Sequence, residues 1–106
     1  MAIEASEGNY AELVGAGSVL VDFWGPRCVP CLAMMPAIED MERTFEGRFR
    51  LVKVNAAENR SICREAKVLS LPTFILFRDG EEVRRLPGAT TEDVKKAVSE
   101  EFESGR

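Results

Sequence analysis

The apolar residues of the chain recur with two spacings, one typical of strands and one typical of helices. Ser18–Trp24 is rich in β-branched and aromatic residues and is apolar on both faces, which is typical of a central strand covered from both sides. From Cys28 to about Phe45, apolar residues return near the 3.6-residue period of a helix. Similar patterns predict strands over Arg50–Asn55, Thr73–Arg78 and Glu82–Leu86, a short edge strand within Ala2–Glu4, a helix capped by Ser6, and helices within Ala56–Leu69 and from Thr90 or Thr91 onward.

Turn and cap residues mark several ends of these elements. Gly47 is expected at the C′ position of the second helix. Asp79 and Gly80 predict a hairpin turn, and the spacing of Thr90 and Asp93 is that of a capping box.

The elements follow the order β-α-β-α-β-α-β-β-α. Strands that alternate with helices and end in a hairpin predict an α/β fold, with a central mixed sheet of four or five strands and helices on both faces. At 106 residues, the chain is expected to form a single domain, 1–106. Within it, residues 1–7 are expected to be a short N-terminal stub and residues 104–106 a frayed tail.

Composition restricts the partners and the location. The net charge is −4 without a compensating basic face, which argues against a nucleic-acid partner. No apolar run approaches 18 residues and no signal-peptide pattern follows Met1, so a soluble cytoplasmic protein without a membrane partner is expected. The chain has no histidine, which excludes Cys–His catalysis, His-ligated zinc and haem.

Two of the three cysteines, Cys28 and Cys31, stand where the second helix begins. A thiol in the first turn of a helix lies near unpaired backbone N–H groups and the positive end of the helix dipole, and both favour the thiolate. Cys28 is therefore expected to have a lowered pKa and to be the nucleophile. Cys31, one turn further on, is expected to resolve the mixed disulfide. Pro30 lies within the first turn, where a missing N–H costs little.

A Cys-x-x-Cys pair is also half of a zinc site. A closed zinc site needs four nitrogen or sulfur ligands, and the chain offers only Cys63 besides this pair. A dithiol/disulfide couple is therefore favoured, while a metal or iron–sulfur cluster shared between two subunits stays open. Cys63 itself is interpreted either as a small buried hydrophobe or as a reactive thiol.

Asp22 is an acid in the middle of the apolar strand before the cysteines. If it is buried, its pKa should rise, so that it can take the proton of Cys31 near neutral pH. Alternation along the strand also fits an Asp22 that faces solvent, and the residues alone leave both alternatives open. Lys53 should lie near Asp22 if their strands pair in parallel, where its charge would offset part of the cost of burial; a solvated lysine is the alternative.

The order of these residues resembles a known family. Asp22–Cys31 reads D-F-W-G-P-R-C-V-P-C, and Pro36 follows five residues later, as in the active-site segment of thioredoxins. Ser70–Gly80, which reads S-L-P-T-F-I-L-F-R-D-G, resembles the cis-proline strand and hairpin of the same family. The likeness covers the chain from about Asn9 to about Phe102 and implies the thioredoxin fold.

The resemblance implies a thiol–disulfide oxidoreductase that reduces protein disulfides through Cys28 and Cys31 and binds no cofactor. The chain has no Gly-rich nucleotide-binding motif, so a separate thioredoxin reductase must recharge it. The implied partners are that reductase and disulfide-containing proteins, and the chain is expected to be a monomer.

The resemblance also assigns residues to the site. Asp22 and Lys53 would manage the proton, and a cis bond at Pro72 would leave the Leu71 backbone free to pair with an extended substrate. The expected substrate-binding surface consists of Trp24, Arg27, Val29, Pro30, Leu71, Pro72 and Gly88.

Four positions depart from the thioredoxin pattern. Val29 replaces a glycine and should narrow access to Cys28. Arg27 replaces a tryptophan, and its guanidinium should lower the pKa of Cys28 and favour acidic or phosphate-bearing partners. Leu32 replaces a lysine and adds apolar contact surface, and Ala57 replaces an acid. Two alternatives therefore stay open: a non-catalytic or metal-binding module of the same fold, and a more oxidising, isomerase-like enzyme.

Overall fold

The computed structural model describes residues 2–45 and 47–103. The expected frayed tail, 104–106, lies outside the described residues. In chain order the elements are β1 (Ile3–Glu4), α1 (Tyr10–Val14), β2 (Ser18–Trp24), α2 (Val29–Thr44), β3 (Arg50–Asn55), α3 (Arg60–Ala66), β4 (Thr73–Arg78), β5 (Glu81–Pro87), α4 (Thr91–Val98) and the π-helical turn η1 (Ser99–Glu103).

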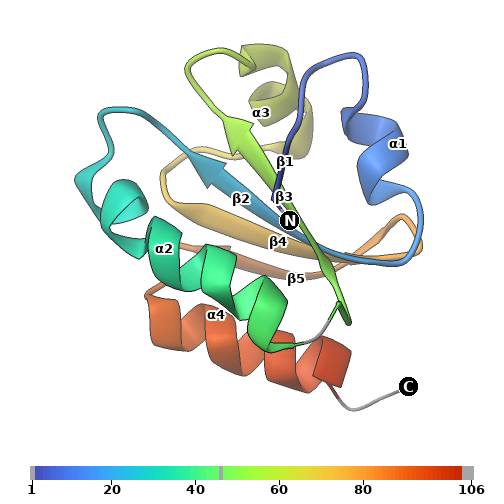
Figure 1. Cartoon of the computed structure of the whole chain (residues 1–106). Coiled ribbons are helices and arrows are strands. Elements are labelled where there is room, and N and C mark those ends of the chain that lie inside the picture. The colour runs from blue at the N-terminus through green and yellow to red at the C-terminus, as the bar shows by residue number, and fades with distance from the viewer. Residues whose placement is uncertain (1, 46, 104–106) are drawn as a thin grey trace.

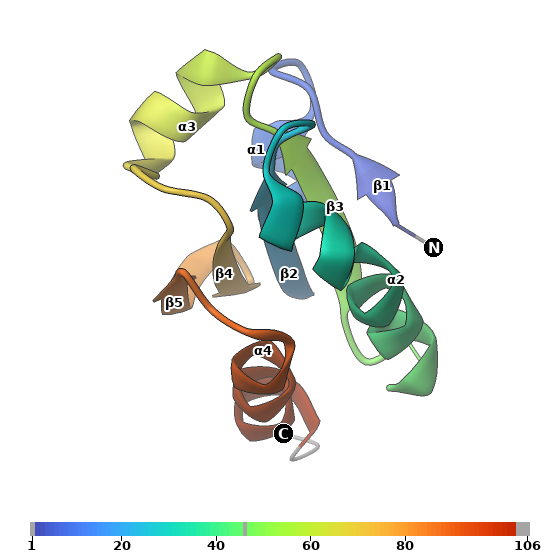
Figure 2. The ribbon, with the colours of Figure 1, turned by 90° about the vertical axis from the view of Figure 1, so that its left-hand side faces the viewer.

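A mixed sheet forms the centre of the fold (Figure 1). Its strand order is β1-β3-β2-β4-β5; β3 runs parallel to β1 and β2, and β4 runs antiparallel to β2 and β5. Helices α1 and α3 cover one face of the sheet, and α2 and α4 cover the other (Figures 1 and 2). The predicted α/β architecture is confirmed, including the short strand at the sheet edge.

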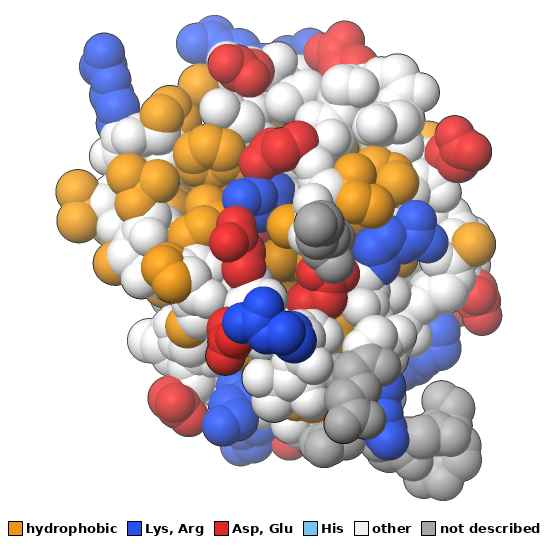
Figure 3. Space-filling model, in the orientation of Figure 1, with side chains coloured by type: hydrophobic (Ala, Val, Ile, Leu, Met, Phe, Trp, Pro, Cys, Tyr) orange, Lys and Arg blue, Asp and Glu red, His pale blue; other side chains and the backbone are white. Residues whose placement is uncertain are grey.

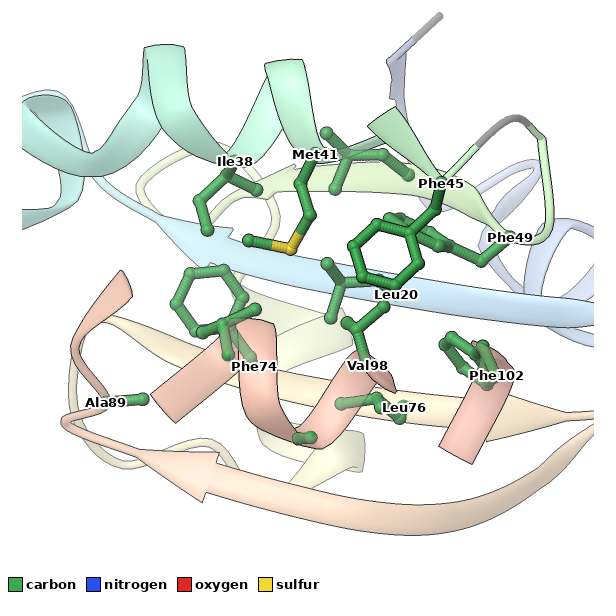
Figure 4. Close-up of a cluster of buried hydrophobic side chains, with 13 residues drawn as sticks. Leu20, Ile38, Met41, Phe45, Phe49, Phe74, Leu76, Ala89, Val98 and Phe102 are labelled. Carbon is green, nitrogen blue, oxygen red and sulfur yellow. The ribbon is translucent and has the colours of Figure 1, made fainter. Parts of the chain in front are cut away.

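Alternate residues of the central strands supply two hydrophobic cores, one on each face of the sheet. On β2, Leu20 belongs to the same core as Ile38 of α2 and Val98 of α4 (Figure 4). Its neighbours Val19 and Val21 belong to the core beneath α1 and α3. All five side chains are fully buried. Strand β2 is therefore covered from both sides, as its apolar pattern predicts.

Two local signals of the sequence are confirmed. Asp79 and Gly80 have φ angles of 51° and 89° and form the turn of the β4–β5 hairpin. Thr90 Oγ1 accepts a hydrogen bond from the Asp93 N–H at 3.1 Å, and Asp93 Oδ2 accepts one from the Thr90 N–H at 3.0 Å. This reciprocal capping box begins α4.

The predicted start of the first helix is wrong. Helix α1 begins at Tyr10, and Ser6 does not cap it. Instead, Asn9 Oδ1 accepts a hydrogen bond from the Ser6 N–H at 2.8 Å, and the Ser6 carbonyl accepts from the N–H groups of Asn9 and Tyr10. The two polar side chains thus stabilise a turn that precedes the helix, because their short side chains bond to nearby backbone as readily as they cap.

Helix α3 lies within Ala56–Leu69, as predicted, and Lys67, which adopts the left-handed conformation with φ 60°, ends it. One further helix end differs from its prediction. Helix α2 ends with Phe45 as its C-cap, so Gly47 lies one residue beyond the C′ position. The C-cap residue Phe45 is itself buried in the core beneath α2 and α4.

Candidate functional site

The two cysteines lie where the chain leaves β2 and enters α2. Cys28 is the N-cap residue of α2, and Cys31 lies in the first turn, as does Pro30. The cysteines form a disulfide with their Cα atoms 5.2 Å apart, and the Cys31 N–H donates to Cys28 Sγ across 3.2 Å. Cys31 is only 2% exposed, whereas Cys28 is half-buried. Of the pair, Cys28 is therefore the more accessible from outside the protein.

The segment before β4 lies beside the cysteine loop. The Leu71–Pro72 bond is cis, as the resemblance implied. A Cβ atom on Gly25 would lie 3.0 Å from Leu71 Cδ1 and 3.9 Å from Cys28 Cβ, so both residues approach Gly25 closely. The Pro72 carbonyl accepts a hydrogen bond from the Gly88 N–H at 2.8 Å. Three segments that are distant in the sequence thus meet at the carboxyl end of β2.

Exposed apolar side chains flank these segments. Val29 and Leu32, in the first turn of α2, are 74% and 44% exposed, and Leu69, shortly before the cis bond, is 96% exposed. Hydrophobic side chains gather on the side of the molecule where α2 begins (Figure 3). Arg27 is also exposed and adds a positive charge to this surface. The surface around Cys28 is therefore mainly apolar, with a cation at its border.

Asp22 lies inside the protein on the α2 side of the sheet. It is 2% exposed, and its Oδ1 atom has no hydrogen-bond partner among the residues that the structure describes. Loss of hydration raises the pKa of Asp22 from 3.8 to about 7; the charge of Lys53 opposes this rise, and the charges of Glu4 and Glu39 add to it. The buried alternative is confirmed, and the solvent-facing one is wrong. A carboxyl group with this pKa exchanges its proton near neutral pH.

Lys53 is the neighbour of Asp22 in register on the parallel strand β3, as predicted. Its ion pairs, however, are made with other carboxylates: Lys53 Nζ lies 2.7 Å from Glu39 Oε2 and 3.5 Å from Glu4 Oε2. The same ammonium lies 6.0 Å from the centre of the Trp24 ring, which is half-buried at the end of β2. Neither glutamate was predicted from the sequence, because their contacts depend on which strand lies beside β3 and on which side of α2 faces it.

Comparison with known proteins settles the family. Residues 1–100 match the family model described as Thioredoxin. The chain belongs to the thioredoxin family. Thioredoxin of Acetoanaerobium sticklandii is 41% identical to it over 85 residues, which cover 80% of this chain and 78% of the relative. Thioredoxin of Staphylococcus haemolyticus is 34% identical over 86 residues, covering 81% of this chain and 83% of the relative.

Solved structures support the fold. A Plasmodium falciparum thioredoxin superposes with a TM-score of 0.88 at 24% identity, covering 93% of this chain and 98% of that one. The Malassezia sympodialis thioredoxin Mala s 13 gives a TM-score of 0.86 at 24% identity, covering 94% of this chain and 89% of that one. With the family and the cysteine pair established, the chain is a thiol–disulfide oxidoreductase of the protein-disulfide reductase type, and Cys28 and Cys31 are its redox centre.

The remaining thiol of this thioredoxin-family chain is Cys63 on α3. It is half-buried, carries no disulfide and packs against the core beneath α1 and α3. Burial raises the pKa of the Cys63 thiol, which disfavours the reactive thiolate. Cys63 lines a shallow groove of about 390 Å³ together with Leu69 and Leu71. These observations favour a packing role over a reactive one.

Two structural findings concern metals and membranes. Within residues 2–45 and 47–103, His, Cys, Asp and Glu side chains form no group of three or more that is arranged to hold a metal ion. In the same part of the chain, none of the helices has the length and apolar character that crossing a membrane requires.

Proposed function

We propose that Cys28 is the attacking nucleophile and Cys31 the resolving thiol in the reduction of target disulfides. The Cys28 thiolate attacks one sulfur of the target, the target S–S bond breaks, and the leaving thiolate takes up a proton. Cys31 then gives its proton to the carboxylate of Asp22 and attacks Cys28 Sγ. The mixed disulfide breaks, the second target sulfur leaves as a thiolate that takes up a proton, and the target departs as a dithiol with two electrons from the chain.

The placement of the two sulfurs carries this proposal. Cys28 is the more accessible residue and accepts the N–H of Cys31 at the start of α2, where the positive end of the helix dipole favours a thiolate. Cys31 is buried on the same side of the helix, so that it can reach Cys28 Sγ but not an external disulfide. Asp22 is buried, and its pKa of about 7 suits it to accept and return a proton at neutral pH.

The proposed substrate surface surrounds Cys28. An extended target segment pairs with the Leu71 backbone beside the cis bond, in the manner of an added strand. Apolar target side chains contact the exposed Val29, and acidic ones contact Arg27. The full proposed set is Trp24, Arg27, Val29, Pro30, Leu71, Pro72 and Gly88.

The wider role follows from the redox chemistry. A separate thioredoxin reductase returns two electrons to the disulfide, since each turnover leaves the chain oxidised. The proposed setting is the cytoplasm, where the chain works as a single-domain monomer in electron transport to proteins and in redox homeostasis. The net charge of −4 supports protein partners rather than nucleic acids or anionic membranes.

A coupled assay tests this function. Catalytic amounts of the chain, NADPH and a thioredoxin reductase are mixed with insulin, and NADPH consumption is followed. The expected rate is proportional to the concentration of the chain and is unchanged in a Cys63→Ser variant. If dithiothreitol drives insulin reduction through the chain but neither nicotinamide–flavin nor ferredoxin-linked reductases do, the proposed recharging step is wrong. If dithiothreitol also fails, the proposed substrate is wrong.

A further inference from the structure

A row of charged residues crosses three strands beneath α2. In register, Glu4 of β1 lies beside Lys53 of β3, and Lys53 lies beside Asp22 of β2. Leu20 and Leu51, two residues earlier on β2 and β3, belong to the core beneath α2 and α4. Because alternate strand residues share a face, the charged row lies on the side of the sheet that α2 covers.

Lys53 is the middle residue of this row, and two glutamates hold its ammonium group. Its ammonium contacts Glu39 Oε2 at 2.7 Å and Glu4 Oε2 at 3.5 Å, while its side chain is only 14% exposed. Glu39 and Glu4 are 44% and 53% exposed. Figure 3 shows a basic side chain between acidic ones on this face. A cleft of about 700 Å³ opens here, lined by Glu4, Glu39 and Lys53 among others.

The Lys53 ammonium forms its short hydrogen bond with Glu39 and not with Asp22 Oδ1. Glu39 takes the short hydrogen bond, whereas Asp22 Oδ1 has no hydrogen-bond partner among the described residues. The charged groups that face Asp22 are Lys53 from β3, Glu4 from β1 and Glu39 from α2; from β4, its neighbour in register is the apolar Phe74. Glu39 therefore acts on Asp22 in two ways: it repels a negative charge there, and it holds the neutralising ammonium toward the cleft.

We propose that Glu39 is a positioning residue that holds the Lys53 ammonium at the cleft and thereby sets the pH at which Asp22 exchanges the proton of Cys31. The inference rests on the proposed function, in which Asp22 is the proton acceptor. Glu4 makes the longer contact with Lys53, but its charge raises the pKa of Asp22 more than that of Glu39 does, so it acts in the same direction. Neither glutamate touches the reacting sulfurs in this scheme.

The test replaces one carboxylate by its neutral isostere. In Glu39→Gln, the Asp22 carboxyl loses a repulsive charge, and the Lys53 ammonium loses its closest charged partner, so that it is held at the cleft less strongly. The titration midpoint of Asp22, followed by carboxyl ¹³C NMR on the oxidised protein, should fall by about 1 pH unit. Asp40→Asn is the matched control, because Asp40 is exposed on the next position of α2 and pairs with Arg43. In Asp40→Asn, the titration midpoint of Asp22 should equal that of the wild type.

A second measurement, the pH profile of activity, distinguishes the positioning role of Glu39 from the proposed role of Asp22 as proton acceptor. The pH profile of kcat/KM for insulin reduction should move with the Asp22 midpoint in Glu39→Gln and stay in place in Asp40→Asn. An unchanged midpoint in Glu39→Gln overturns the positioning role, whatever the activity. A midpoint that falls while the rate profile stays in place shows that Asp22 does not carry the proton, which overturns the proposed role of Asp22 and this inference with it. Both substituted side chains are exposed, so the variants are expected to fold.

Discussion

Replacing Cys28 with serine should reduce insulin reduction by roughly 1,000-fold or more, because the reaction needs a thiolate nucleophile at that position and a serine hydroxyl is not ionised near neutral pH. The buried Cys31 cannot substitute for it, since it is only 2% exposed. The measurement is dithiothreitol-driven insulin reduction at equal protein concentrations.

Two further variants make the result specific to the proposed order of attack. Cys31→Ser should form the mixed disulfide at Cys28 and stop there, with mass spectrometry showing one target molecule bound per chain. Cys63→Ser should reduce insulin at the wild-type rate, because Cys63 lies on α3, outside the redox pair. Wild-type activity in Cys28→Ser, or target trapped on Cys63, would contradict the account.

Replacing Asp22 with asparagine should stabilise the oxidised protein at pH 8 by up to about 4 kcal/mol. Burial raises the pKa of Asp22 from 3.8 to about 7. Between these values, the folded protein keeps a proton that the unfolded chain has released, so the free energy of unfolding falls as the pH rises. Above pH 7 the acid is ionised in both states and the whole cost of burying the charge remains. Asparagine has nearly the same shape and no charge to bury.

Urea unfolding at several pH values measures this effect. The gain in Asp22→Asn should be largest at pH 8, should be small by pH 4, and should vanish well below pH 3.8, where aspartic acid is protonated in both states. A matched Asp40→Asn variant should show no such pH dependence, because Asp40 is exposed. A gain of the same size at pH 4 and pH 8 would mean that packing, rather than the buried charge, distinguishes asparagine from aspartate at position 22.

The sequence predicts those parts of the site that depend on neighbours along the chain. Cys28 and Cys31 follow from their place at a helix start, and the burial of β2 follows from its two apolar faces. The hairpin at Asp79 and the capping box at Thr90 are likewise local, because a few consecutive residues determine them.

What the sequence does not predict depends on distant segments. Glu39 and Glu4 hold Lys53 only because β1 pairs with β3 and α2 packs against β3, and no periodicity along the chain records these contacts. The sequence left open whether Asp22 is buried or faces solvent for the same reason, because an acid in an apolar strand does not show which segment covers it. Ser6 shows that a local prediction can also fail: its N–H bonds to the Asn9 side chain, so the two residues form a turn before α1 and neither caps it.

The most direct test of the central claim is the equilibrium reduction potential of the Cys28–Cys31 couple, measured in glutathione or dithiothreitol buffers with thiols counted by mass after alkylation. We expect a two-electron transition in which the chain passes from three alkylated cysteines to one, at a strongly reducing potential of about −270 mV. A potential of about −180 mV, the range of protein disulfide isomerase, would contradict the reductase assignment and show that Arg27 and Val29 have shifted the couple toward an isomerase.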